Sequence, residues 1–224
     1  EMLKKIKKFN GNKLFGHVYD HANYRNHQKF LINHNFKLVQ TNREYSCDIR
    51  EVNTEKYQSL IKKLESEGIK FYDSRDEMKD FPNHLKKLEK LEWTLDQDIP
   101  HPDGIKPTRM PFEQWKKVVL DFYNNSYGVD IVAVKDEQYI GSTDIEVYPK
   151  SEPYKGWTGG LGVIREFRRK GIATVLKVKA IEALLKKGVT EVRTDNEENN
   201  PMYKINVALG FKPVPFSLEY IKEI

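Results

Sequence analysis

The chain has 224 residues, 32% of them charged and 38% hydrophobic, and contains three Trp, 12 Tyr and 11 Phe. This composition is typical of a folded globular protein and excludes an intrinsically disordered chain. The formal net charge of +5 suits an anionic ligand, but 38 basic against 33 acidic residues is too small an excess to indicate nucleic-acid binding.

A single cysteine, Cys47, excludes an internal disulfide framework and fits a reducing compartment. Every apolar run is shorter than the ~20 residues that a membrane helix needs, and no signal-peptide pattern opens the chain. We therefore expect a cytoplasmic protein that binds no membrane.

The first half of the chain alternates helical and strand patterns. A helix is expected from Tyr24 towards Phe36, with Asn35 where a left-handed residue often ends a helix. A strand follows in residues 37–49, and the apolar spacing of residues 54–68 predicts a helix that Gly68 ends. A short strand at 68–72 and a helix at 83–93 complete this half.

The second half opens with a proline-rich loop from residue 98 and a helix at 111–122, with Phe112, Trp115, Val119 and Phe122 inward. Residues 130–147 predict a β-hairpin that turns near Asp136 and Glu137. The remaining pattern is a glycine-rich strand at 156–164, a helix at 172–187, a strand at 189–195, and a helix ending at 209–210. Strands alternating with helices predict an α/β or α+β fold.

A basic loop precedes the helix that starts at residue 172. Arg168, Arg169 and Lys170 stand directly before Gly171. The first turn of a helix has N–H groups without intrahelical partners, and its dipole end is positive. Cationic side chains and a glycine at this point indicate a phosphate site, although a solvated basic loop would have the same composition.

The order of these elements resembles the GNAT N-acetyltransferase family. The family's Arg/Gln-x-x-Gly-x-Gly/Ala motif is met by Arg168, Gly171 and Ala173, and an asparagine-rich turn and a final LGF follow at the expected spacing. DIPHPDG, PFEQW and TDNEENNPMYKINVALGF are similar to the tandem-GNAT, mycothiol-synthase-like branch.

This resemblance implies a mixed central sheet flanked by helices, preceded by a partial, degenerate GNAT-like unit. NYRNHQKFLINHNFKLV resembles NNPMYKINVALGFKPV, as an internal repeat would. We expect a remnant of the first unit at 1–50, a helical connection at 51–98 and a catalytic domain at 99–224.

The resemblance also implies acetyl-CoA as co-substrate and assigns its contacts. The loop and helix start would bind the pyrophosphate, the preceding strand would offer its edge to the pantetheine amides, and the Val163 N–H would be an oxyanion donor. Asn199 would contact the pantetheine arm, or would only cap a helix. The expected cofactor residues are Leu161, Gly162, Val163, Ile164, Arg168, Arg169, Lys170, Gly171, Ile172, Ala173, Thr174 and Asn199.

Catalytic candidates come from the strand GSTDIEVY. Its alternation places Asp144, Glu146 and Tyr148 on one face, which indicates either a cleft with a general base or a wet strand end. Where many family members have a general-acid tyrosine, this chain has Asn206, and Tyr203 lies nearly one turn earlier. We therefore assign Glu146, Asp144 and Asn206 to catalysis.

The sequence gives little support for a metal site or a dinucleotide-binding site. His17 and His21 lie in a strand-and-turn pattern without a carboxylate pair, so we expect no metal. GGLGV lacks the third glycine of a dinucleotide fingerprint. The leading hypothesis is an N-acetyltransferase that acts on a primary amine of a small molecule, and the alternative is a non-catalytic coenzyme A sensor. A tandem aminoacyl transferase is disfavoured because RRKGIA looks like a working coenzyme A loop.

Overall fold

The computed structural model describes residues 12–99, 106–197 and 202–223. Its strands are β1 (Lys13–Tyr19), β2 (Lys37–Asp48), β3 (Ile69–Asp73), β4 (Val129–Lys135), β5 (Gln138–Val147), β6 (Lys155–Val163), β7 (Glu191–Glu197), β8 (Lys212–Pro213) and β9 (Ser217–Glu223). Its helices are α2 (Arg25–Asn33), α3 (Gln58–Ser66), α4 (His84–Asp96), α5 (Phe112–Asn125), α6 (Ile172–Lys186) and α7 (Tyr203–Ala208).

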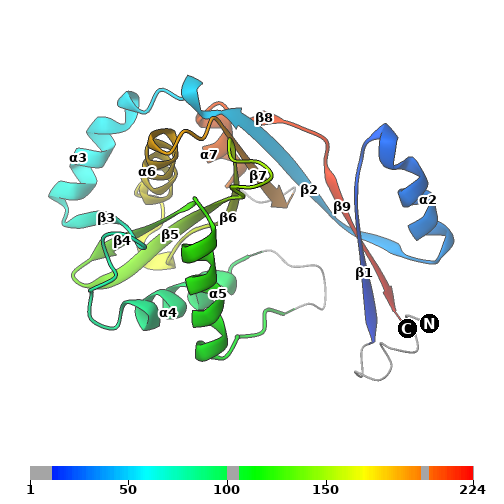
Figure 1. The fold of residues 1–224 in the computed structure, drawn as a ribbon, viewed down its shortest axis with the longest axis horizontal. Coiled ribbons are helices and arrows are strands. Elements are labelled where there is room, and N and C mark those ends of the chain that lie inside the picture. Colours follow the sequence, from blue (N-terminus) through cyan, green and yellow to red (C-terminus); the bar gives the residue numbers. More distant parts are fainter. Residues whose placement is uncertain (1–11, 100–105, 198–201, 224) are drawn as a thin grey trace.

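One mostly antiparallel sheet organises the described residues, in the order β1-β9-β2-β7-β6-β5-β4-β3, with β8 pairing β2. Helices α3 and α6 lie on one face of the sheet, and α4 and α5 lie on the other (Figure 1). The predicted mixed sheet flanked by helices is therefore confirmed.

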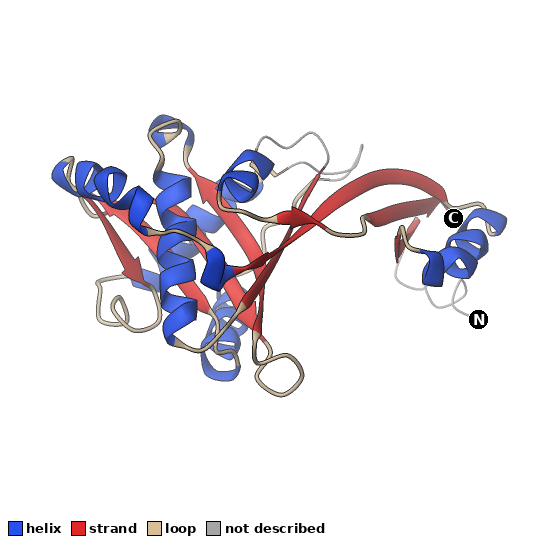
Figure 2. Ribbon diagram, turned by 90° about the horizontal axis from the view of Figure 1, so that it is seen from above, coloured by secondary structure: helices blue, strands red, loops and turns tan. Residues whose placement is uncertain are grey.

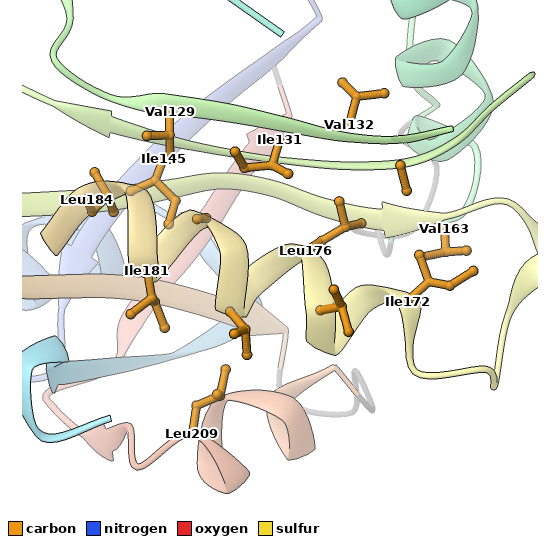
Figure 3. Packing of buried hydrophobic residues seen from close by; sticks show 14 of the residues in the cluster. Val129, Ile131, Val132, Ile145, Val163, Ile172, Leu176, Ile181, Leu184 and Leu209 are labelled. Carbon is orange, nitrogen blue, oxygen red and sulfur yellow. The ribbon is translucent and has the colours of Figure 1, made fainter. Parts of the chain in front are cut away.

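Helix α6 is the centre of the core, as its apolar pattern predicts. Eight of its residues are buried, and Leu176 and Leu184 pack towards the strands (Figure 3). Ile145 and Val147 of β5 are fully buried on the same side. Alternation along β5 therefore turns Asp144 and Glu146 to the opposite face, which α4 and α5 cover.

The turns agree with the sequence prediction where left-handed residues are needed. Asp136 and Glu137 both have positive φ, at 46° and 62°, as a two-residue hairpin turn requires. Asn35 has a φ of 61° just after α2, and Gly68 has a φ of 82° just after α3. Helix α5 differs from the prediction, because the residues expected inward are only partly buried and Trp115, Val119 and Phe122 face a cavity.

An arm extends from the main sheet. Strands β1 and β9 and the first half of β2 carry a second, small core of Val18, Leu218 and Tyr220, covered by α2 (Figure 2). The second half of β2, from Asn42 to Asp48, pairs with β7 in the main sheet. Strand β2 is thus shared by the two cores, and the boundaries at residues 50 and 98 stay predictions.

Among the described residues, none of the helices is both long and apolar enough to cross a bilayer. The cytoplasmic location stays a prediction.

Candidate functional site

The sheet opens between its two central parallel strands. Strand β6 pairs with β7 only from Lys155 to Trp157, opposite Glu191 to Arg193, although both strands continue. The Ile164 N–H donates to the Ile140 carbonyl over 2.9 Å. Because alternate residues of an antiparallel strand bond to opposite neighbours, the N–H groups of Leu161 and Val163 face the opening.

The N-terminus of α6 lies at the end of β6. The first-turn N–H groups of Ile172, Ala173 and Thr174 have no intrahelical partner, as in any α-helix. The N-cap residue is Gly171, with a φ of 88°, and it has no side chain that could bond to these groups. Arg169 also has positive φ, at 61°. Left-handed residues of this kind turn successive N–H groups towards one point, which forms an anion-binding concavity. The residues therefore fit a pyrophosphate.

Arg168 is less available than the motif implies. Its Nε donates to the Val163 carbonyl over 2.8 Å, and its guanidinium forms an ion pair with Asp98. Arg165 forms a second ion pair with the same carboxylate, and its hydrogen bond is the main reason why the pKa of Asp98 is lowered. Asp98 thus fixes the loop from the α4 side. Arg168 stays exposed despite this ion pair, as do Arg169 and Lys170.

A cavity of about 1,020 Å³ connects this loop to the face of β5. Its walls come from α4, α5, β4, β5, β6, the start of α6 and the start of α7. Of the predicted cofactor residues, Ile164 and Lys170 lie outside the lining, and Asn199 lies outside the described residues. The others line the cavity, namely Leu161, Gly162, Val163, Arg168, Arg169, Gly171, Ile172, Ala173 and Thr174.

Glycines shape the β6 wall. A Cβ on Gly159 would lie 2.0 Å from Asp144 Oδ2, and a Cβ on Gly162 would lie 2.9 Å from Leu95 of α4. Side chains at these positions would displace the Asp144 carboxyl and fill the cavity. The glycine-rich sequence therefore makes room beside β5.

Carboxyl groups gather at the β5 end of the cavity, where Asp130 is buried and Asp144 and Glu92 are half-buried. Asp130 and Asp144 are directly opposite each other on β4 and β5, and Glu92 of α4 completes the group. Burial raises the pKa of Asp144 to about 7, that of Glu92 to about 8 and that of Asp130 to about 6. Acids opposite each other across strands destabilise a sheet, so this arrangement favours a functional role.

Glu146 lines the same wall and accepts a hydrogen bond from the Tyr148 hydroxyl over 2.6 Å. This bond is the main cause of the raised pKa of Tyr148. The structure therefore brings Asp144 and Glu146 together in the cavity, as strand alternation predicts, and Tyr148 supports Glu146 from its exposed side.

Helix α7 places the two remaining candidates away from the cavity. Asn206 is buried, and its Nδ2 donates to Asn196 Oδ1 over 2.8 Å. Tyr203 is 37% exposed, whereas Met202, Lys204 and Ile205 line the cavity. The structure gives Asn206 a bond to β7 rather than a position beside the carboxyl groups.

Several functional-site features were missed at the sequence level. Glu92 and Asp130 lie in segments that read as an amphipathic helix and a continuous apolar strand. Lys177 of α6 is fully buried, and its Nζ donates to Thr158 Oγ1 over 3.1 Å, just past the last β6–β7 pair. Burial lowers the pKa of Lys177 to about 7.

The part of the chain that the structure describes contains no group of three or more His, Cys, Asp and Glu side chains that could hold a metal ion.

Comparison with known proteins supplies the family to which this fold and cavity belong. Residues 85–208 match the family model described as Acetyltransferase (GNAT) family. The match spans more than half of the chain, so the chain belongs to the GNAT acetyltransferase family. The family predicted from RRKGIA and the LGF motif is confirmed.

Solved structures agree in fold. A tandem GNAT protein from the clavulanic acid biosynthesis pathway has a TM-score of 0.69 at 18% identity, covering 98% of this chain and 66% of that one. A GCN5-related N-acetyltransferase from Sphaerobacter thermophilus has a TM-score of 0.65 at 15% identity, covering 98% and 64%. The chain thus spans just under two thirds of both structures. A search of curated proteins found no match.

Proposed function

We propose that the protein is an acetyl-CoA-dependent N-acetyltransferase that acetylates a primary amine of a small molecule. The observation that carries this proposal is the continuity of the cavity. It runs from the N-terminus of α6, past the unpaired edge of β6, to the carboxyl groups of β4 and β5.

Each end suits one substrate. The first-turn amides of α6, with Arg169 and Lys170, would bind the coenzyme A pyrophosphate. The unpaired N–H groups of Leu161 and Val163 would bond the pantetheine arm as an added strand does, and the Val163 N–H would stabilise the oxyanion. The thioester would then lie beside Asp144.

The carboxyl groups suit a cationic amine. An ammonium ion placed among Asp130, Asp144 and Glu92 would supply the positive charge that buried carboxylates require. Transfer requires that the amine lose a proton before attack, and Glu146 and Asp144 are our candidates for the general base. The carboxyl pKa values near neutrality suit that task.

The test is turnover. The protein is incubated with acetyl-CoA and a library of small amines, and free thiol is followed together with the mass of each amine. We expect thiol release that depends on a subset of amines, each of which gains one acetyl group. Saturable acetyl-CoA binding without thiol release for any amine would overturn the enzyme proposal and favour the non-catalytic coenzyme A sensor.

A further inference from the structure

A chain of hydrogen bonds runs from the cavity wall into the core. The Tyr123 hydroxyl donates to Asp130 Oδ2 over 2.7 Å and lies 2.6 Å from Ser74 Oγ. Ser74 Oγ lies 3.0 Å from His84 Nε2, and His84 Nδ1 lies 3.0 Å from the Tyr139 hydroxyl. Four polar contacts therefore connect β4, α5, the end of β3, α4 and β5.

The chain is buried at every point beyond the cavity. Asp130 is 5% exposed, Ser74 1%, His84 6% and Tyr139 6%. Asp130 and Tyr123 line the cavity, whereas Ser74, His84 and Tyr139 do not. A buried polar network is costly unless each member is satisfied, and apolar residues could pack this region without that cost. The network therefore calls for a role beyond packing.

Donor and acceptor roles fix the direction of the chain. An ionised Asp130 only accepts, so the single proton of Tyr123 is used there. The contact of 2.6 Å with Tyr123 must then use the proton of Ser74. His84 must therefore carry its proton on Nε2 to donate to Ser74, and its Nδ1 accepts from Tyr139.

Protonation of Asp130 reverses every one of these bonds. Asp130 then donates to Tyr123, Tyr123 to Ser74, and Ser74 to His84 Nε2, so that the His84 proton moves to Nδ1 and points at Tyr139. The chain thus has two orientations, and the protonation state of a carboxyl group in the cavity selects between them.

We propose that Asp130, Tyr123, Ser74 and His84 form a proton-transfer chain that removes the proton released by the acceptor amine from the cavity. This proposal rests on the proposed function. Acetylation of an ammonium ion by a thioester yields the amide, the free thiol and one excess proton, and the chain accepts that excess proton.

The Asp130 carboxylate takes one proton from the ammonium ion and leaves the neutral amine with its lone pair. In the reversed orientation, the Asp130 proton moves to Tyr123, the Tyr123 proton to Ser74, and the Ser74 proton to His84 Nε2. Asp130 is again a carboxylate, and His84 is an imidazolium that donates from Nδ1 to Tyr139. Asp144 and Glu146 stay available for the second amine proton, which ends on the thiol.

The electrostatics agree with this geometry. Burial raises the pKa of Asp130 to about 6 and lowers the pKa of His84 below its ordinary 6.5, which brings the proton affinities of the two ends together. Asp73 raises the Asp130 pKa and Arg75 lowers it. The other acids near Asp130 are Asp144 on the neighbouring strand and Glu92 of α4. Near His84, Lys87 lies over the Tyr139 ring, 5.7 Å from its centre.

The decisive measurement is the tautomer of His84, read by ¹⁵N NMR of the substrate-free protein at about pH 8, where Asp130 is ionised. The parent should carry the proton on Nε2. In Asp130→Asn, the amide nitrogen can donate to Tyr123 as the protonated carboxyl would, so Tyr123 donates to Ser74, Ser74 donates to His84 Nε2, and the proton should move to Nδ1. The control Tyr139→Phe should keep the Nε2 proton. An Nδ1 proton in the parent, or no switch in Asp130→Asn, would overturn the proposal.

Kinetics supply the second arm. Tyr123→Phe and Ser74→Ala break the chain at different atoms, and each should lower kcat by about 10²-fold, the lower range for general acid–base catalysis, with KM for acetyl-CoA unchanged. The midpoint of the rise of kcat with pH should shift to a higher pH. Tyr72→Phe, a matched change on β3 outside the chain, should behave like the parent.

Unchanged pH profiles in both chain variants would overturn the proposal. A parent that acetylates no amine would instead remove the proposed function, while the tautomer switch, which needs no substrate, would still decide whether the chain exists.

Discussion

Asp144→Asn should make the protein more stable in alkaline solution. Burial raises the pKa of Asp144 from 3.8 to about 7, so the fold accommodates the protonated carboxyl and resists its ionisation. The stability that this group contributes is fully present below pH 3.8 and is lost as the pH rises through about 7. One pKa unit corresponds to about 1.4 kcal/mol, so ionisation of Asp144 costs the folded state at most roughly 4 kcal/mol.

An amide cannot ionise, so the variant avoids this cost. The gain in the free energy of unfolding is smaller than this maximum, because the repulsion that Asp144 feels is shared with its acidic neighbours Asp130 and Glu146. Between roughly pH 5 and pH 8.5, we expect the variant to gain about 2–3 kcal/mol of stability relative to the parent. The assay is urea unfolding of parent and variant at both pH values. Parallel pH dependences of the free energy of unfolding would refute the assignment of a raised pKa to Asp144.

Three further changes test separate parts of the site. Gly171→Asp places a carboxylate at the α6 N-terminus and should weaken coenzyme A binding by at least about tenfold, measured by calorimetry. Gly188→Asp, at the other left-handed glycine of the same helix and with open space around its Cβ, is the matched control, and equal loss in both would reject the pyrophosphate site. The pKa of Lys177 is lowered from 10.5 to about 7, so the buried side chain reduces stability as the pH falls through that range. Lys177→Met should remove this loss, worth at most roughly 5 kcal/mol, and an unchanged slope of unfolding free energy against pH would contradict it. Glu146→Gln should lower kcat by about 10²-fold if Glu146 is the base, while Tyr203→Phe should cost little because Tyr203 lies outside the cavity lining. Steady-state kinetics decide this pair, and the opposite order would make Tyr203 the general acid.

The sequence predicts the fold well because most of its signals are local. Left-handed residues end helices or turn hairpins at Asn35, Gly68 and Asp136, and the apolar spacing of α6 identifies the central helix. Strand alternation also orients Asp144 and Glu146 correctly, because one face of β5 is fully buried.

The rest of the site depends on contacts between distant segments. Asp130 stands in a strand that is apolar on both faces, so alternation assigns it no side. Ser74 and His84 carry no local pattern, and only the packing of β3, α4 and α5 brings them to Tyr123. Its position in a motif makes Asn206 a catalytic candidate, but the structure gives its side chain a hydrogen bond to Asn196.

Acetyl-CoA is proposed to bind through the α6 N-terminus and the open edge of β6. A calorimetric titration of the parent protein with acetyl-CoA tests this binding most directly. We expect one saturable site with a dissociation constant in the low-micromolar range or tighter, for which coenzyme A competes. The absence of binding of either ligand at high protein concentration would contradict it.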